Sequence, residues 1–126
     1  GIEKTLQNLV ENADDPGVRI NSLFGLCKEG NEWGLQSAVS FIKDDNQLDS
    51  LKSAFLGGIL MLKSDSVVPI IDTLTEKYSD HNETMKACIR YYKKLDTPLG
   101  IQRLQSMSVN GNLSAEIRSA ALAALN

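Results

Sequence analysis

The sequence predicts an all-α protein, a right-handed superhelix (solenoid) of four antiparallel helix pairs with a period of about 33 residues. Along the 126-residue chain, an apolar residue at position i is followed by others at i+33, i+66 and i+99, which form a ladder. Within each repeat the apolar residues are three and four positions apart, which places them on one face of a helix. Residues typical of helix ends separate the apolar stretches, and no alternating β-branched run competes with the helical pattern.

The second helix of each repeat carries four of these ladders. At the i+33 interval they lead from Val18 to Leu51, Thr84 and Ile117, from Ser22 to Phe55, Cys88 and Ala121, from Leu23 to Leu56, Ile89 and Leu122, and from Leu26 to Ile59, Tyr92 and Leu125. Self-similarity at one fixed period is typical of stacked copies of a single helix pair.

The first helix of each repeat carries two more ladders. In both, the interval between the second and third repeats is one residue shorter than the other two intervals. They comprise Leu6, Val39, Ile71 and Leu104, and Leu9, Ile42, Leu74 and Met107. The shorter interval predicts that the third repeat is one residue shorter in a loop.

Helix-capping residues give the boundaries in the first half of the chain. The first helix is expected over Ile2–Asn12, and the second opens at Asp15-Pro16. There the aspartate can cap free N–H groups, and proline suits the first turn. The third helix is expected to start near Asn31, and the fourth follows residues 44–46.

Similar signals mark the second half. The fifth helix is expected to start at residues 64–66 and the sixth at Ser79-Asp80, where Glu83 completes a capping box with Asp80. Residues 96–98 begin the seventh helix, and residues 110–112 precede the eighth.

The four repeats are expected to span residues 1–29, 30–63, 64–95 and 96–126 of one domain. Central repeats are covered on both sides, so residues 54–62, the longest apolar run, should be buried all round. The alanine-rich end leaves the last repeat thinly covered, and the chain opens without methionine. We therefore expect a segment of a longer protein.

The composition excludes several classes of protein. The chain is 42% apolar and 23% charged, as folded domains are. Its 13 basic and 16 acidic residues give a net charge of −3, which predicts no nucleic-acid partner. The longest apolar run is too short to insert across a membrane.

Cysteine and histidine are too few to hold a metal ion. Cys27, Cys88 and the single His81 form no cluster with three or four zinc ligands, so neither metal nor cofactor is expected. Because the cysteines lie in the first and third repeats, we expect them to be too far apart for a disulfide bond.

The second helices of the first and last repeats carry related motifs, Asp15-Pro-Gly-Val18-Arg19-x-x-x-Leu23-x-x-Leu26 and Glu116-Ile117-Arg118-x-x-x-Leu122-x-x-Leu125. These motifs resemble HEAT repeats, although the usual HEAT unit is about forty residues long. Lys52 replaces the arginine in the second repeat, and Met85 replaces it in the third. The resemblance covers the whole chain and implies a scaffold, not a particular chemistry.

A narrower likeness concerns zinc aminopeptidases of the aminopeptidase N type. The chain is similar in size and make-up to their helical C-terminal domain, which helps to admit peptide substrates. The HExxH zinc motif of that family is absent from this sequence. The resemblance therefore implies an accessory part of such an enzyme.

A ladder of basic residues is the first candidate binding site. Arg19, Lys52 and Arg118 share one repeat position, with Lys86 beside the gap at Met85. Such a row could receive carboxylates or phosphate. Alternatively each cation pairs with an acid in the preceding turn, which for Arg19 means residues 14–15.

Two aromatic residues are the other candidates for partner contacts. Tyr91 stands where the other repeats have Gly25, Gly58 and Ala124, so it is either a hot spot for a partner or a cover over a gap between repeats. Trp33, in the first turn of its helix, is either a half-buried cover or an anchor.

The expected function is a non-catalytic scaffold that binds a protein or peptide. The alternative is an accessory C-terminal domain of a larger enzyme such as a zinc aminopeptidase, where the partner would be the rest of the parent chain. No nucleophile or second carboxylate can be assigned beside His81, so no independent enzyme is expected.

Overall fold

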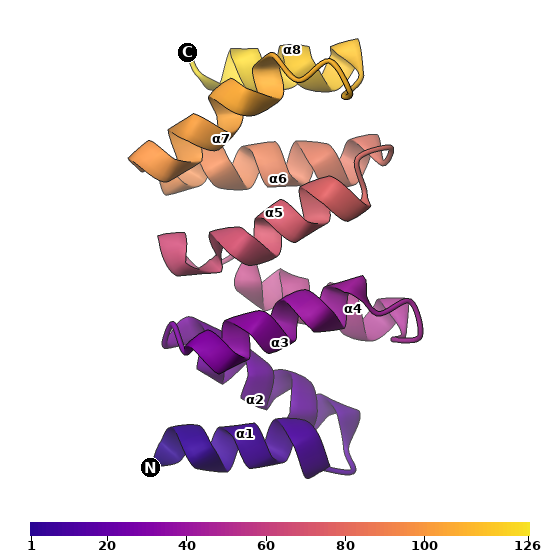
Figure 1. The fold of residues 1–126 in the computed structure, drawn as a ribbon, viewed down its shortest axis with the longest axis vertical. Coiled ribbons are helices and arrows are strands. Elements are labelled where there is room, and N and C mark those ends of the chain that lie inside the picture. The colour runs from indigo at the N-terminus through magenta and orange to yellow at the C-terminus, as the bar shows by residue number, and fades with distance from the viewer. The chain divides into compact units, whose positions relative to one another are not determined.

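The computed structural model describes all residues, 1–126, and consists of eight α-helices and one 3₁₀ turn without any strand (Figure 1). The predicted all-α class is therefore confirmed. The chain divides into two compact units, residues 1–62 and residues 63–126. Unit 1 contains α1 (Ile2–Asn12), α2 (Pro16–Lys28), α3 (Glu32–Lys43) and α4 (Asp49–Ile59). Unit 2 contains η1 (Asp65–Val67), α5 (Val68–Lys77), α6 (Asn82–Leu95), α7 (Pro98–Ser108) and α8 (Ala115–Ala124).

The two units have the same order of elements at a fixed offset. The helices of unit 2 begin at positions 68, 82, 98 and 115, and each start is the i+66 position of its counterpart at 2, 16, 32 and 49. The helices α2, α4, α6 and α8 begin at positions 16, 49, 82 and 115, which follow one another at the i+33 interval. The period read from the apolar ladders is thus present in the starts of the second helices of the repeats.

One helix is central in each unit. In unit 1, α2 packs against α1, α3 and α4, and in unit 2, α6 packs against α5, α7 and α8. The helix α7 also packs on α8, whereas the main contacts of α3 and α4 are with α2. None of the helices combines the length and the apolar character needed to cross a membrane.

Most helix starts agree with the predicted caps. The Gly17 N–H donates to Asp15 Oδ1 over 2.8 Å, so Asp15 caps α2 as expected. The prediction for α6 is wrong, because its N-cap is His81, and the side chain of His81 makes no capping hydrogen bond. Asp80 lies one residue too early to form the capping box expected with Glu83.

The burial pattern confirms one ladder at all four positions and corrects one position of another. Ser22, Phe55, Cys88 and Ala121 are all buried. In α3 the buried residue is Ala38, which is in step with Ile71 and Leu104 at the i+33 interval, whereas Val39 is half-buried. The other ladder keeps its shortened interval, because Ile42 and Leu74 are both buried.

The apolar run over residues 54–62 is less buried than expected. Only Phe55 and Ile59 are buried, and the side chain of Met61 is 77% exposed. The run begins within α4, which ends at Ile59, so its last residues lie beyond the helical face that packs on α2.

Both cysteines are free and buried, so no disulfide links them. Burial raises the pKa of each thiol to about 12 and keeps both protonated at neutral pH. Cys27 and Cys88 thus act as small apolar core residues.

The closest helix crossings occur at two glycines that occupy equivalent positions in the two units. A Cβ atom on Gly34 of α3 would lie 2.5 Å from the Leu26 Cβ of α2. A Cβ atom on Gly100 of α7 would lie 2.6 Å from the Tyr92 carbonyl oxygen of α6. Gly100 is the i+66 position of Gly34, and Tyr92 is the i+66 position of Leu26. Both units therefore use the same contact, and only glycine fits it.

Substitution of Gly34 by alanine should destabilise the protein, because the new methyl group meets a Cβ atom that cannot rotate away. We expect Gly34→Ala to lower the free energy of unfolding by about 1–3 kcal/mol, measured by urea denaturation. Gly57 of α4 is the control, since a Cβ atom there would have no neighbour within 4 Å. Gly57→Ala should raise stability by up to about 1 kcal/mol, and a stabilising Gly34→Ala would contradict the close crossing.

Candidate functional site

In unit 1, the residues predicted to meet a partner differ in exposure. Arg19 of α2 is exposed, Trp33 of α3 is half-buried, and the Lys52 side chain of α4 is only 5% exposed. The expected ion pair of Arg19 with Asp14 or Asp15 does not form, because the Asp15 carboxylate is engaged as the cap of α2. Arg19 and Lys52 therefore do not form one exposed basic row.

In unit 2, the predicted residues are held by contacts within the unit. Tyr91 is 3% exposed, and burial is the main cause that raises the pKa of its hydroxyl. The half-buried Arg118 donates from its guanidinium to the Leu113 carbonyl. Lys86 pairs with Glu116 at 2.8 Å. Of the five residues predicted to meet a partner, only Arg19 is exposed.

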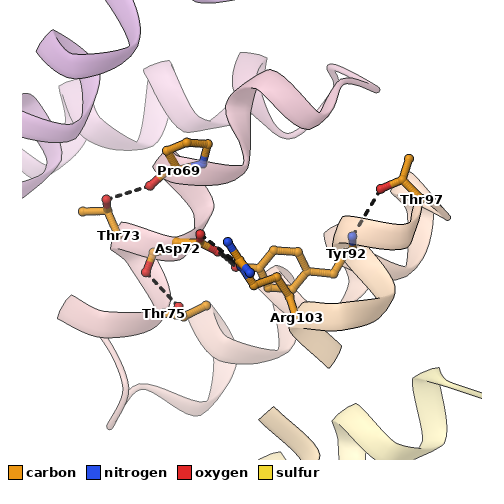
Figure 2. A network of polar contacts seen from close by, with 8 residues as sticks. Pro69, Asp72, Thr73, Thr75, Tyr92, Thr97 and Arg103 are labelled. Atoms are coloured by element: carbon orange, nitrogen blue, oxygen red, sulfur yellow. Dashed lines mark hydrogen bonds and ion pairs between the residues drawn. The ribbon is translucent and has the colours of Figure 1, made fainter. Parts of the chain in front are cut away.

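A polar network joins three helices of unit 2 (Figure 2). The Tyr92 hydroxyl of α6 donates to Asp72 Oδ1 of α5 over 2.6 Å. Arg103 Nε of α7 lies 3.0 Å and 3.1 Å from the two oxygens of the same carboxylate. Desolvation, followed by the Asp72 carboxylate, raises the pKa of Tyr92, and the hydrogen bond to Asp72 is the main cause that raises the pKa of Arg103.

This network is best understood as a structural link. Both oxygens of Asp72 accept hydrogen bonds from neighbouring helices, which uses the carboxylate to hold α5, α6 and α7 together. The Tyr92 ring is 1% exposed, so only its hydroxyl reaches the polar rim. Tyr92 is therefore a core residue, in agreement with its place in the ladder that begins at Leu26.

A groove in unit 1 lies beside Arg19, and we call it the Arg19 groove. Its volume is about 280 Å³. All four helices and the loop before α4 contribute to its lining, which consists of Val10, Pro16, Arg19, Ile20, Leu23, Ser37, Ser40, Phe41, Asp44, Gln47 and Leu51. Its wall is mainly apolar, and its polar groups are few, as in sites that bind a side chain or a small molecule.

The two charged side chains of the Arg19 groove differ in the hydrogen bonds and ion pairs that they make within the chain. Asp44 Oδ1 accepts from the Asn46 N–H over 2.9 Å, and Asp44 Oδ2 accepts from Gln47 Nε2 over 3.3 Å. Arg19 makes no ion pair within the chain and leaves its five donors available to a ligand. The groove therefore combines an apolar wall with one unengaged cation.

The counterpart of this groove in unit 2 contains apolar side chains. At the i+66 offset, Met85 takes the place of Arg19 and Leu113 takes the place of Gln47. Met85 is fully buried and Leu113 is 8% exposed. A hollow of about 200 Å³ remains beside them, lined in large part by polar residues of α5 and of the loops around it.

Sequence reasoning singled out Arg19 but missed the groove beside it. The ladders compared repeats at the i+33 interval, where Arg19 meets Lys52, another cation. Comparison at i+66 instead pairs Arg19 with Met85 and Gln47 with Leu113. This exchange of two polar residues for two apolar ones is the signal that could have located the groove.

Comparisons of the chain with protein-family models, with curated proteins and with solved structures find no significant match.

Removal of the Tyr92 hydroxyl should loosen the polar network without opening the core. We expect Tyr92→Phe to lower the free energy of unfolding by about 1–2 kcal/mol, because a hydrogen bond to a charged acceptor is lost. Tyr78→Phe is the matched control, since that ring is half-buried and contacts the His81 ring. Urea denaturation measures both changes, and an unchanged midpoint for Tyr92→Phe would contradict the structural role of the network.

Proposed function

We propose that the chain is a non-catalytic, HEAT-like helical-repeat module that binds a protein or peptide. One observation carries the proposal: the Arg19 groove is open in unit 1, whereas the buried Met85 and Leu113 narrow its counterpart in unit 2 to a hollow of about 200 Å³. In the same backbone arrangement, the chain's own side chains thus fill more of the space in unit 2, and unit 1 leaves more of it available to a ligand.

The side chains in unit 2 indicate which ligand group the Arg19 groove accepts. An aliphatic side chain the size of methionine or leucine matches what Met85 and Leu113 supply to the equivalent space. Burial of such a side chain is favourable by about 1.5–3 kcal/mol. A carboxylate beside it would pair with Arg19, whose guanidinium can bind both carboxylate oxygens.

The repeat pattern supports the HEAT-like part of the proposal. The helices α2, α4, α6 and α8 begin at the i+33 interval, and α2 and α8 carry the motifs that resemble HEAT repeats. Helical repeats use side chains from successive units to bind extended partners. The shorter period remains a difference from the usual HEAT unit.

The proposal can be tested by selecting ligands from a displayed library of random peptides. The selected peptides should share a methionine or leucine next to an acidic residue. The double variant Arg19→Met/Gln47→Leu, which copies unit 2, should weaken their binding at least about tenfold, because the new side chains occupy the groove. It should unfold at the same temperature as the parent protein or higher.

The matched control places the same two substitutions outside the groove. Lys28→Met/Gln36→Leu changes exposed residues of α2 and α3 and should leave peptide affinity unchanged. Equal binding by the groove-filling variant and the parent protein would refute the proposed site. A library that yields no ligand would refute the proposed function.

A further inference from the structure

A second groove lies between α6 and α8 of unit 2, and we call it the cationic groove. Its volume is about 340 Å³, and its lining consists of Lys86, Ile89, Arg90, Lys93, Ala120, Ala123 and Ala124. All the cations come from α6, and all the alanines come from α8. One wall is therefore positively charged, and the opposite wall consists of small apolar side chains.

The three cations of α6 share one face of the helix. Lys86, Arg90 and Lys93 are spaced by four and three positions, which brings them into one row. Glu116 Oε1 holds Lys86 at 2.8 Å, and Glu116 Oε2 accepts from Asn82 Nδ2 over 2.7 Å. Arg90 and Lys93 are exposed and make no ion pair within the chain.

A neighbouring hollow of about 470 Å³ extends the positive surface. It shares Lys93 and Ala124 with the cationic groove and adds Lys63 and Lys94. The acidic groups beside the two hollows are Glu83 and Glu116 near Lys86, and Asp96 near Lys94. The five cations outnumber these three acids.

The equivalent place in unit 1 is closed by an aromatic ring. Arg90 and Ala124 are the i+66 positions of Phe24 and Gly58. The Phe24 ring lies 3.0 Å from the position that a Cβ atom on Gly58 would take. Phe24 thus covers the surface between α2 and α4. In unit 2 an arginine replaces the ring, and the surface between α6 and α8 stays open.

We propose that the cationic groove binds an acidic amphipathic helix of a partner protein. Carboxylates at positions i, i+4 and i+7 of such a helix would match the row of Lys86, Arg90 and Lys93, since both helices have the same rise per residue. The alanine wall lets a second helix approach closely and bury small or aliphatic side chains. This surface is separate from the Arg19 groove and does not depend on ligand binding there.

The groove suits a polypeptide better than a nucleic acid. Its lining contains no aromatic ring on which a base could stack. Nucleic-acid binding depends on many phosphate contacts, whereas this groove offers one short row of cations on a chain with a net charge of −3. The apolar alanine wall adds a contact that a phosphate backbone would leave unused.

The probes are two synthetic peptides of about 20 residues, long enough to be helical in water. The first carries glutamates at i, i+4 and i+7 with leucines on the adjoining face, and the second replaces the glutamates by glutamine. Fluorescence anisotropy measures their binding to the full chain. The glutamate peptide should bind at least about tenfold more tightly, and added salt should reduce the difference.

Two variants of the chain test the groove itself. Arg90→Glu/Lys93→Glu should weaken binding of the glutamate peptide at least about tenfold through charge repulsion. Arg90→Phe/Ala124→Gly copies unit 1. The new ring should cover the groove and weaken binding of the glutamate peptide to a similar extent. Circular dichroism verifies that both variants are folded.

The matched control is Lys4→Glu/Lys28→Glu, which reverses two exposed cations of unit 1 and gives the same net charge as the reversal on α6. It should leave peptide affinity within about twofold of the parent value. Equal affinity for the two peptides, an equal loss in the control, or unchanged binding by both groove variants would overturn the proposal. Tighter binding of a single-stranded thymidine oligonucleotide than of the glutamate peptide would also overturn it, in favour of a nucleic-acid partner.

Discussion

The close crossing of the third helix over the central helix is the contact on which each unit depends. At Gly34 and at Gly100 the helix backbones approach to a distance that admits no side chain. The same glycines complete the helix caps, because the Gly34 N–H donates to Asn31 Oδ1 and the Gly100 N–H donates to Thr97 Oγ1. Each capping residue also donates to an acidic side chain near the start of its unit, Asn31 to Glu3 and Thr97 to Asp65. The helix cap, the close helix crossing and the hydrogen bond to the start of the unit are therefore equivalent in the two units.

The two units differ in which surface groove is occupied by their own side chains. Unit 1 leaves the space beside Arg19 open and covers the surface between α2 and α4 with Phe24. In unit 2, Met85 is buried and a smaller hollow of about 200 Å³ remains beside it, while the surface between α6 and α8 is open beside Arg90. The two units share a backbone pattern, while a few side chains decide which surface can receive a partner. This reciprocity is the physical basis of both binding proposals.

The periodic part of the structure could be predicted from the sequence, because a repeated pattern fixes the helices. The helix of residues 2–12 and the buried ladder that begins at Ser22 were read directly from apolar spacing. The residue at which a helix begins was harder to predict, because neighbouring residues compete for the N-cap position. The N-cap of α6 at His81 is an example. The grooves depend on which single side chain enters a shared space. A ladder of mostly apolar residues does not distinguish Phe24, which covers a surface, from Arg90, which borders an open one.

The central claim, that equivalent spaces are filled in opposite ways, can be measured by nuclear Overhauser spectroscopy on the whole chain in solution. The account predicts contacts from the Phe24 ring protons to the Gly58 Hα protons, because the ring covers that glycine. It also predicts that the Met85 methyl group contacts other core methyl groups of unit 2, since its side chain is fully buried. A Phe24 ring without contacts to α4, together with a solvent-exposed Met85 methyl group, would contradict it.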